Sequence, residues 1–131
     1  MTIQLAISSL DRNGLASPVS EHFGRCPYFT LAEIEDNTIK SIAVIDNPLA
    51  HNHAPGQIPA FIHQQGANVM LTGGMGHRAV TFFEQYGIEV VTGAAGTVQQ
   101  AIQAYLNGSI RGHSPCAESR RHHGLGEESK L

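Results

Sequence analysis

The spacing of apolar residues predicts three strands in the first third of the chain. In each of them apolar and polar positions alternate, as expected where one face of a strand is buried. The second and third strands are separated only by Asp36-Asn37, a pair that favours a tight turn, so we expect them to form an antiparallel hairpin. The three expected strands cover residues 2–9, 28–35 and 38–46.

Beyond this hairpin the apolar period changes to that of amphipathic helices. Three helices are expected, and Gly66, Gly87 and Gly108 lie just beyond their ends. Two short apolar runs, residues 68–72 and 88–91, separate these helices and are typical of parallel strands buried on both faces. The three apolar helix faces comprise Ile58, Phe61 and Ile62, then Ala79, Phe82, Phe83 and Tyr86, and finally Val98, Ala101, Ile102, Tyr105 and Leu106.

The resulting order, β-β-β-α-β-α-β-α, predicts an α/β fold with a mixed five-stranded sheet flanked by helices. The hairpin is antiparallel, and right-handed crossovers join the later strands. The chain of 131 residues has the size of one ordinary domain. Residues 109–131 lose all apolar periodicity, so we expect a folded domain over residues 1–108 and a flexible tail that contains histidine and cysteine.

The composition is poor in charge and rich in glycine and histidine. Only 15% of the residues are charged, whereas there are 14 glycines and 8 histidines, and the 2 cysteines are too few for a disulfide framework. Residues 1–108 hold four Lys or Arg and eight Asp or Glu, a balance of −4, and residues 109–131 hold four and three, a balance of +1. This distribution argues against binding of nucleic acid. No apolar run is long enough for a membrane span and no signal peptide is recognisable, so we expect a soluble cytoplasmic protein with reduced thiols.

The long polar loop before the second strand contains the first candidate site, the His22 loop (residues 20–26, SEHFGRC). An imidazole, a thiol and the guanidinium of Arg25 lie close together in sequence, and the guanidinium would lower the pKa of the Cys26 thiol and attract an anion. The alternative is purely structural. In that interpretation Phe23 anchors the loop in the core, His22 bonds to the backbone and Cys26 is a small buried residue.

A second candidate site is the glycine turn (residues 73–76), which follows a strand and leads into a helix that begins near His77. Glycines allow the backbone to approach a ligand closely, and the start of a helix offers free N–H groups to an anion. Residues 74–79 satisfy the dinucleotide pattern G-x-G-x-x-A, but no acidic residue ends the next strand, which weakens a nucleotide-binding interpretation. The alternative is a tight turn that needs glycine for steric reasons.

The remaining histidines provide two further groups of metal ligands. In an extended segment, His51 and His53 would point to the same side and could chelate a metal, although two ligands rarely complete a site, and a solvated loop is the alternative. The tail lacks the second thiolate of a usual structural zinc site, so adventitious metal capture is its alternative. The tail ligands are His113, Cys116, His122 and His123.

Taken in order, these motifs resemble the dinitrogenase iron-molybdenum cofactor biosynthesis family over about residues 1–110. The resemblance rests on H-F-G-R-x-x-x-F at residues 22–29, on the strand followed by G-G-x-G, and on the helix start GTVQQA. It implies a ribonuclease H-like α/β domain and a protein that binds, carries or shields an iron-sulfur or iron-molybdenum cluster. It also implies transient binding, so that the isolated protein need not contain the cluster, and nitrogenase or cofactor-assembly proteins as partners.

A carrier of a large anionic cluster should offer few covalent ligands, several hydrogen-bond donors and a cleft, so that the cluster can be released. We therefore expect a non-enzymatic cluster carrier. Two alternatives are a metal-sensing or regulatory module that uses the tail, and a nucleotide-binding or nuclease-like enzyme, which the scattered carboxylates disfavour. The expected cofactor-binding residues are His22, Arg25, Cys26, Gly73, Gly74, Gly76 and His77, and the expected metal ligands are His22, Cys26, His51, His53 and the four tail residues.

Overall fold

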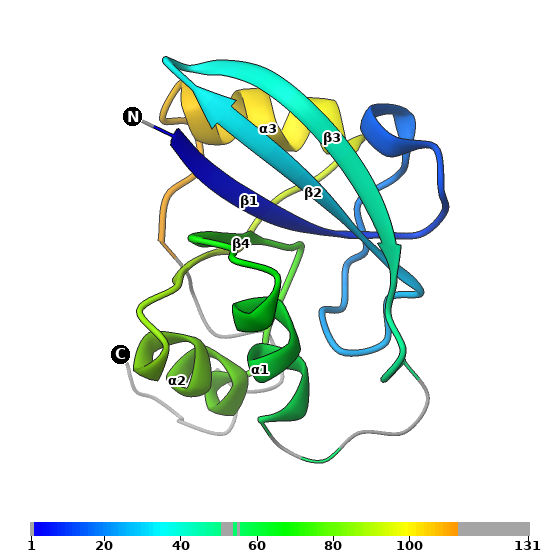
Figure 1. The fold of residues 1–131 in the computed structure, drawn as a ribbon, viewed down its shortest axis with the longest axis vertical. Helices are drawn as coiled ribbons and strands as arrows, with labels where there is room; N and C mark the ends of the chain where they lie inside the picture. The colour runs from blue at the N-terminus through cyan, green and yellow to red at the C-terminus, as the bar shows by residue number, and fades with distance from the viewer. Residues whose placement is uncertain (1, 51–53, 55, 113–131) are drawn as a thin grey trace, which may run out of the picture.

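A computed structural model describes residues 2–50, 54 and 56–112 and shows one mixed sheet of five strands with three α-helices (Figure 1). The predicted α/β fold and the order of its elements are confirmed. The strands are β1 (Thr2–Ser9), β2 (Tyr28–Glu35), β3 (Thr38–Asp46), β4 (Val69–Leu71) and β5 (Glu89–Val91). The helices are α1 (Gln57–Gln64), α2 (His77–Gln85) and α3 (Val98–Leu106), with a short 3-10 turn at Gly14–Ala16.

The sheet has the order β3-β2-β1-β4-β5, so β1 lies at its centre. It pairs antiparallel with β2 and parallel with β4, and β5 extends the parallel part. The hairpin turn between β2 and β3 has Asp36 and Asn37 at φ values of 53° and 62°. Both residues tolerate this left-handed conformation, which matches the twist of a hairpin, so the turn forms where the sequence predicted it.

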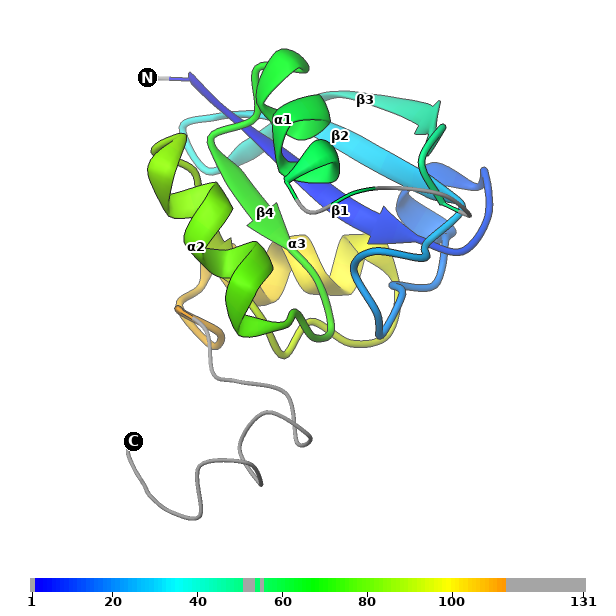
Figure 2. The ribbon, with the colours of Figure 1, turned by 90° about the horizontal axis from the view of Figure 1, so that it is seen from below.

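Helices cover both faces of the sheet, with α1 and α2 on one face and α3 on the other (Figure 2). Alternate residues of the central strand therefore belong to two cores. Ala6 of β1 packs with the α1 and α2 residues, whereas its neighbours Leu5 and Ile7 pack with α3. The three residues of β4 are all buried, as predicted for a parallel strand with helices on both sides.

The buried face of α2 is turned relative to the predicted one. Val80 and Phe83 are its buried residues, while Phe82 is only half-buried. Tyr86, expected on the apolar face, is 38% exposed, and its ring stacks on that of His63 with 4.6 Å between the ring centroids. The prediction for Tyr86 was wrong because stacking on an exposed α1 residue replaces burial in the core at this end of the helix.

The start of α3 and the end of the described chain are both well fixed. Thr97 and Gln100 form a capping box, in which each side chain bonds the backbone N–H of the other residue. Beyond α3, Ile110 packs against the α3 core, and the N–H of Thr92 donates to the carbonyl of Gly112 at 2.9 Å. The rest of the segment predicted to be a flexible tail lies outside the described residues. No helix in the described ranges has the length and apolar character needed to span a membrane.

Candidate functional site

The loops that follow β1, β4 and β5 meet at one edge of the sheet, which we call the carboxyl edge (residues 10–27, 72–76 and 92–97). These three strands run parallel, so their carboxyl ends lie on the same side, as the arrowheads of β1 and β4 show in Figure 2. In open α/β sheets ligands bind outside the carboxyl ends of the strands. The loops are joined by backbone hydrogen bonds from Gly73 N to Ser20 O (3.2 Å), from Gly93 N to Gly73 O (3.1 Å) and from Val19 N to Gly96 O (2.9 Å).

The glycine turn is in close contact with the His22 loop. A Cβ atom on Gly73 would lie 2.7 Å from the Cα of Glu21, and one on Gly74 would lie 3.2 Å from the Glu21 carbonyl oxygen. No atom lies within 4 Å of a Cβ placed on Gly76. Two of the three predicted glycines are therefore needed so that the backbone of the His22 loop can approach. The structure brings these two candidate sites together.

This difference between the glycines can be tested with one substitution at two positions. We expect Gly73→Ser to lower the free energy of unfolding by about 1–3 kcal/mol, because the backbone of Glu21 cannot move aside as a flexible side chain would. Gly76→Ser is the matched control, since its Cβ enters open space at the N-cap of α2 and its effect should stay within about 0.5 kcal/mol. Urea unfolding followed by circular dichroism measures both, and equal losses would contradict the close approach.

Within the His22 loop, buried and exposed residues are interleaved. Phe23 is only 6% exposed, and its ring packs edge-on against that of Phe83 with 5.2 Å between the centroids. His22 and Arg25 are exposed. The hydroxyl of Ser20 donates to the His22 carbonyl at 2.8 Å and accepts the His22 N–H at 3.3 Å, so the backbone that carries the imidazole is fixed while the ring is accessible.

Cys26 belongs to the core rather than to the surface of the loop. It is 1% exposed, and the side-chain amide of Asn47 donates to its carbonyl at 2.8 Å. Burial raises the pKa of the Cys26 thiol to about 12, so the lowering expected from the neighbouring Arg25 is reversed. A thiolate is the form that binds metals. In this conformation Cys26 is therefore a buried neutral thiol, as the structural alternative predicted.

The raised pKa of Cys26 makes stability depend on pH. An unfolded thiol loses its proton near pH 8.5, whereas the folded one keeps it until about pH 12, so deprotonation favours the unfolded chain as the pH rises. We expect Cys26 to account for a loss of about 1–2 kcal/mol in the free energy of unfolding between pH 8 and pH 10. The measurement compares urea unfolding of Cys116→Ala with that of Cys116→Ala/Cys26→Ala. Parallel pH profiles would show that the thiol titrates normally.

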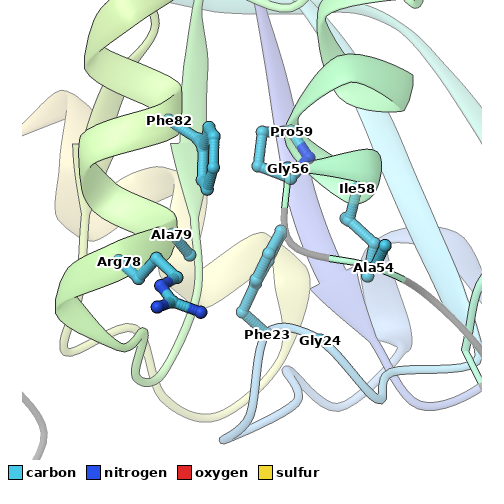
Figure 3. Close-up of a pocket in the computed structure, with 9 residues that line it drawn as sticks. All are labelled: Phe23, Gly24, Ala54, Gly56, Ile58, Pro59, Arg78, Ala79 and Phe82. Carbon is cyan, nitrogen blue, oxygen red and sulfur yellow. The ribbon is translucent and has the colours of Figure 1, made fainter.

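Next to the carboxyl edge, a pocket of about 310 Å³ opens between α1 and α2 (Figure 3). We call it the α1–α2 pocket. The described residues on its wall include no His, Cys, Asp or Glu, and their one charged side chain is that of Arg78. The lining residues are Phe23, Gly24, Ala54, Gly56, Ile58, Pro59, Arg78, Ala79 and Phe82.

The sequence predicted neither this pocket nor the role of Arg78 in it. A signal was present, because Arg78 and Phe82 are four residues apart and so share one side of a helix. The apolar pattern places Phe82 on the core face of this helix and predicts no role for Arg78. In the structure this side of the helix faces the start of α1, and Phe82 lies opposite Pro59 (Figure 3).

Of the other predicted site residues, one lies in the described part of the chain and the rest lie outside it. His77 is the exposed first residue of α2, whose N-cap Gly76 provides no side-chain cap. No group of three or more His, Cys, Asp and Glu that could hold a metal ion occurs in the part of the chain that the structure describes. The remaining predicted ligands, His51, His53, His113, Cys116, His122 and His123, lie outside the described residues.

Comparisons with known proteins cover most of the described domain. A family model described as dinitrogenase iron-molybdenum cofactor matches residues 3–108, which include the His22 loop and the glycine turn. An uncharacterised protein of Methanocaldococcus jannaschii is 32% identical over 103 residues, or 77% of this chain and 84% of the relative.

Solved structures share the fold of this chain. The crystal structure of the protein PH0822 is 38% identical with a TM-score of 0.75, and the match covers 84% of this chain and 96% of the other. The apo form of the orange protein from Desulfovibrio gigas is 28% identical with a TM-score of 0.73, and the match covers 86% of this chain and 93% of the other. Each match spans most of both chains.

Proposed function

Since this chain belongs to the dinitrogenase iron-molybdenum cofactor family, we propose that it binds and carries an iron-sulfur or iron-molybdenum cluster without catalysing a reaction. The observation that carries the proposal is the placement of His22. Its backbone is fixed by Ser20, its imidazole is exposed, and its loop lies against the glycine turn at the carboxyl edge. His22 is thus an accessible ligand for the cluster, whereas Cys26 is buried in the core beneath it.

The charges around the carboxyl edge suit an anionic cargo. Arg25 forms no ion pair with any described residue, unlike Arg12, which pairs with Asp46. The first turn of α2 has no side-chain cap, so its N–H groups can meet an anion, and exposed His77 adds a second imidazole there. Guanidinium and N–H donors stabilise an anionic cluster without binding its metals, which allows release.

In this proposal His22 is the primary ligand and His77 an additional donor. The remaining features of the function follow from the family. We propose that nitrogenase or cofactor-assembly proteins are its partners, that it acts in the cytoplasm, and that its domain is of the ribonuclease H-like type. The mixed five-stranded sheet with helices on both faces supports the last point. His51, His53 and the tail ligands are further candidates for metal binding.

The test is anaerobic uptake of cluster by the isolated protein. Purified protein is incubated with isolated iron-molybdenum cofactor or with a [4Fe-4S] cluster donor, desalted, and analysed for molybdenum, iron and electronic absorption. We expect about one cluster per chain, retained when the chain is truncated after Gly112. Failure to retain metal above the level of the urea-unfolded protein contradicts the carrier function. Uptake that disappears on truncation would favour a metal sensor that uses the tail.

A further inference from the structure

We propose that the α1–α2 pocket is a second binding site, which takes a small aromatic carboxylate. The pocket is separate in chemistry from the cluster site, because its described wall contains no side chain that ligates a metal. Its volume of about 310 Å³ lies at the lower end of the range for small-molecule sites, about 300–1,000 Å³. The inference goes beyond the carrier function and does not depend on it.

The walls of the pocket favour an apolar, ring-shaped body. Phe23 from the His22 loop and Phe82 from α2 flank the space, and Ile58 and Pro59 from the start of α1 complete the apolar side (Figure 3). Aromatic side chains attract a further ring in stacked or edge-on geometry. A body with several hydroxyl or amide groups would lose hydrogen bonds to water here, since the described wall offers few polar partners.

The pocket is preformed on two sides. Phe23 is held from behind by Phe83 and Phe29, at ring-centroid distances of 5.2 and 6.2 Å. Gly56 adopts a φ of 86°, and a Cβ on it would lie 3.1 Å from the Phe82 ring, so glycine at this position lets the start of α1 approach Phe82. A binding wall that is already ordered costs little conformational entropy on binding.

Arg78 determines the charge of the ligand. Its guanidinium is directed toward Phe23 at the margin of the pocket (Figure 3), and it forms no ion pair with the described residues. A guanidinium matches a carboxylate through two parallel hydrogen bonds. With no described acidic residue on the wall to neutralise it, Arg78 selects an anion over a neutral or cationic compound of the same shape.

The experiment uses 1-naphthaleneacetate as the probe, with 1-naphthaleneacetamide as its uncharged counterpart and acetate as the anion without a ring. Calorimetry measures affinity for the full chain, and amide-nitrogen NMR spectra locate the site. We expect naphthaleneacetate to bind about tenfold more tightly than the acetamide, because a hydrogen bond to a charged group is lost, and acetate not to bind. The largest shifts should fall in residues 23–24, 56–59 and 78–82.

Two variants identify the groups responsible. Arg78→Gln should weaken binding of naphthaleneacetate about tenfold and leave the acetamide unchanged. Ala79→Leu should fill the pocket and abolish binding of both ring compounds. Arg111→Gln, which removes an exposed arginine outside the pocket, is the control and should bind as the unaltered protein does.

Three results would overturn the proposal. They are no binding of naphthaleneacetate up to millimolar concentration, equal affinity for naphthaleneacetate and the acetamide, and spectral shifts centred outside the pocket. The third result is obtained with the unaltered protein, so the proposal is testable even if Ala79→Leu does not fold. Because all measurements use protein without cluster, failure here is distinguishable from failure of the carrier function.

Discussion

Replacing His22 by alanine is expected to reduce cluster retention by at least about tenfold, since loss of even an outer partner of a metal site typically costs tenfold to a hundredfold. The reason is the accessibility of the ligands. Cys26, the other soft ligand of the loop, is 1% exposed and its pKa is raised to about 12, so it offers no thiolate to a cluster in the folded protein. The readout is molybdenum and iron bound per chain after anaerobic uptake and desalting.

The matched control for this variant is His63→Ala. Like His22, His63 is an exposed histidine. It is carried by α1, where it stacks on Tyr86, and it lies outside the carboxyl edge. It should retain as much cluster as the unaltered protein. If His22→Ala also retains it, while urea-unfolded protein does not, the primary ligand lies elsewhere, and His22→Ala/His77→Ala then tests the second imidazole.

The elements of this fold are predictable because each has a local signal. Alternation marks β1 to β3, and the pair Asp36-Asn37 adopts the left-handed turn that its residue types favour. Thr97 caps α3 with Gln100 at the third helical position, a pattern that spans only four consecutive residues. Such signals depend on neighbours within a few positions, so they can be interpreted without knowing the tertiary structure.

The site is less predictable because its geometry depends on contacts between distant segments. Gly73 is needed for the approach of Glu21, which is 52 positions away. Cys26 lies beside Arg25 in sequence, yet Arg25 is exposed in a turn while Cys26 is buried in the core, and this burial determines the pKa of the thiol. Arg78 borders a pocket because the start of α1, at Gly56, lies close to the ring of Phe82 on α2.

One residue of the His22 loop connects the stability of the domain to its site. Phe23→Ala is expected to lower the free energy of unfolding by about 3–5 kcal/mol, the range for removing a buried phenylalanine. The ring is 6% exposed and contacts both Phe29 and Phe83 in the core beneath α1 and α2. Urea unfolding measures the loss. Phe82→Ala is the control, because this half-buried ring borders the pocket and should cost about 1–2 kcal/mol.

Phe23→Ala also tests whether the Phe23 ring anchors the His22 loop in the core or whether the loop only lies on the surface. If Phe23 fixes the loop, its removal should release the backbone on both sides of it, so hydrogen exchange of the Gly73 N–H, which donates to Ser20, should become faster than in Phe82→Ala. Phe23→Ala should also retain less cluster, although His22 is still present, because the imidazole is no longer held beside the glycine turn. Equal stability of the two variants would mean that hydrogen bonds rather than the Phe23 ring position the His22 loop, and Ser20→Ala, which removes the hydroxyl that bonds the His22 backbone, would then be the substitution that lowers retention.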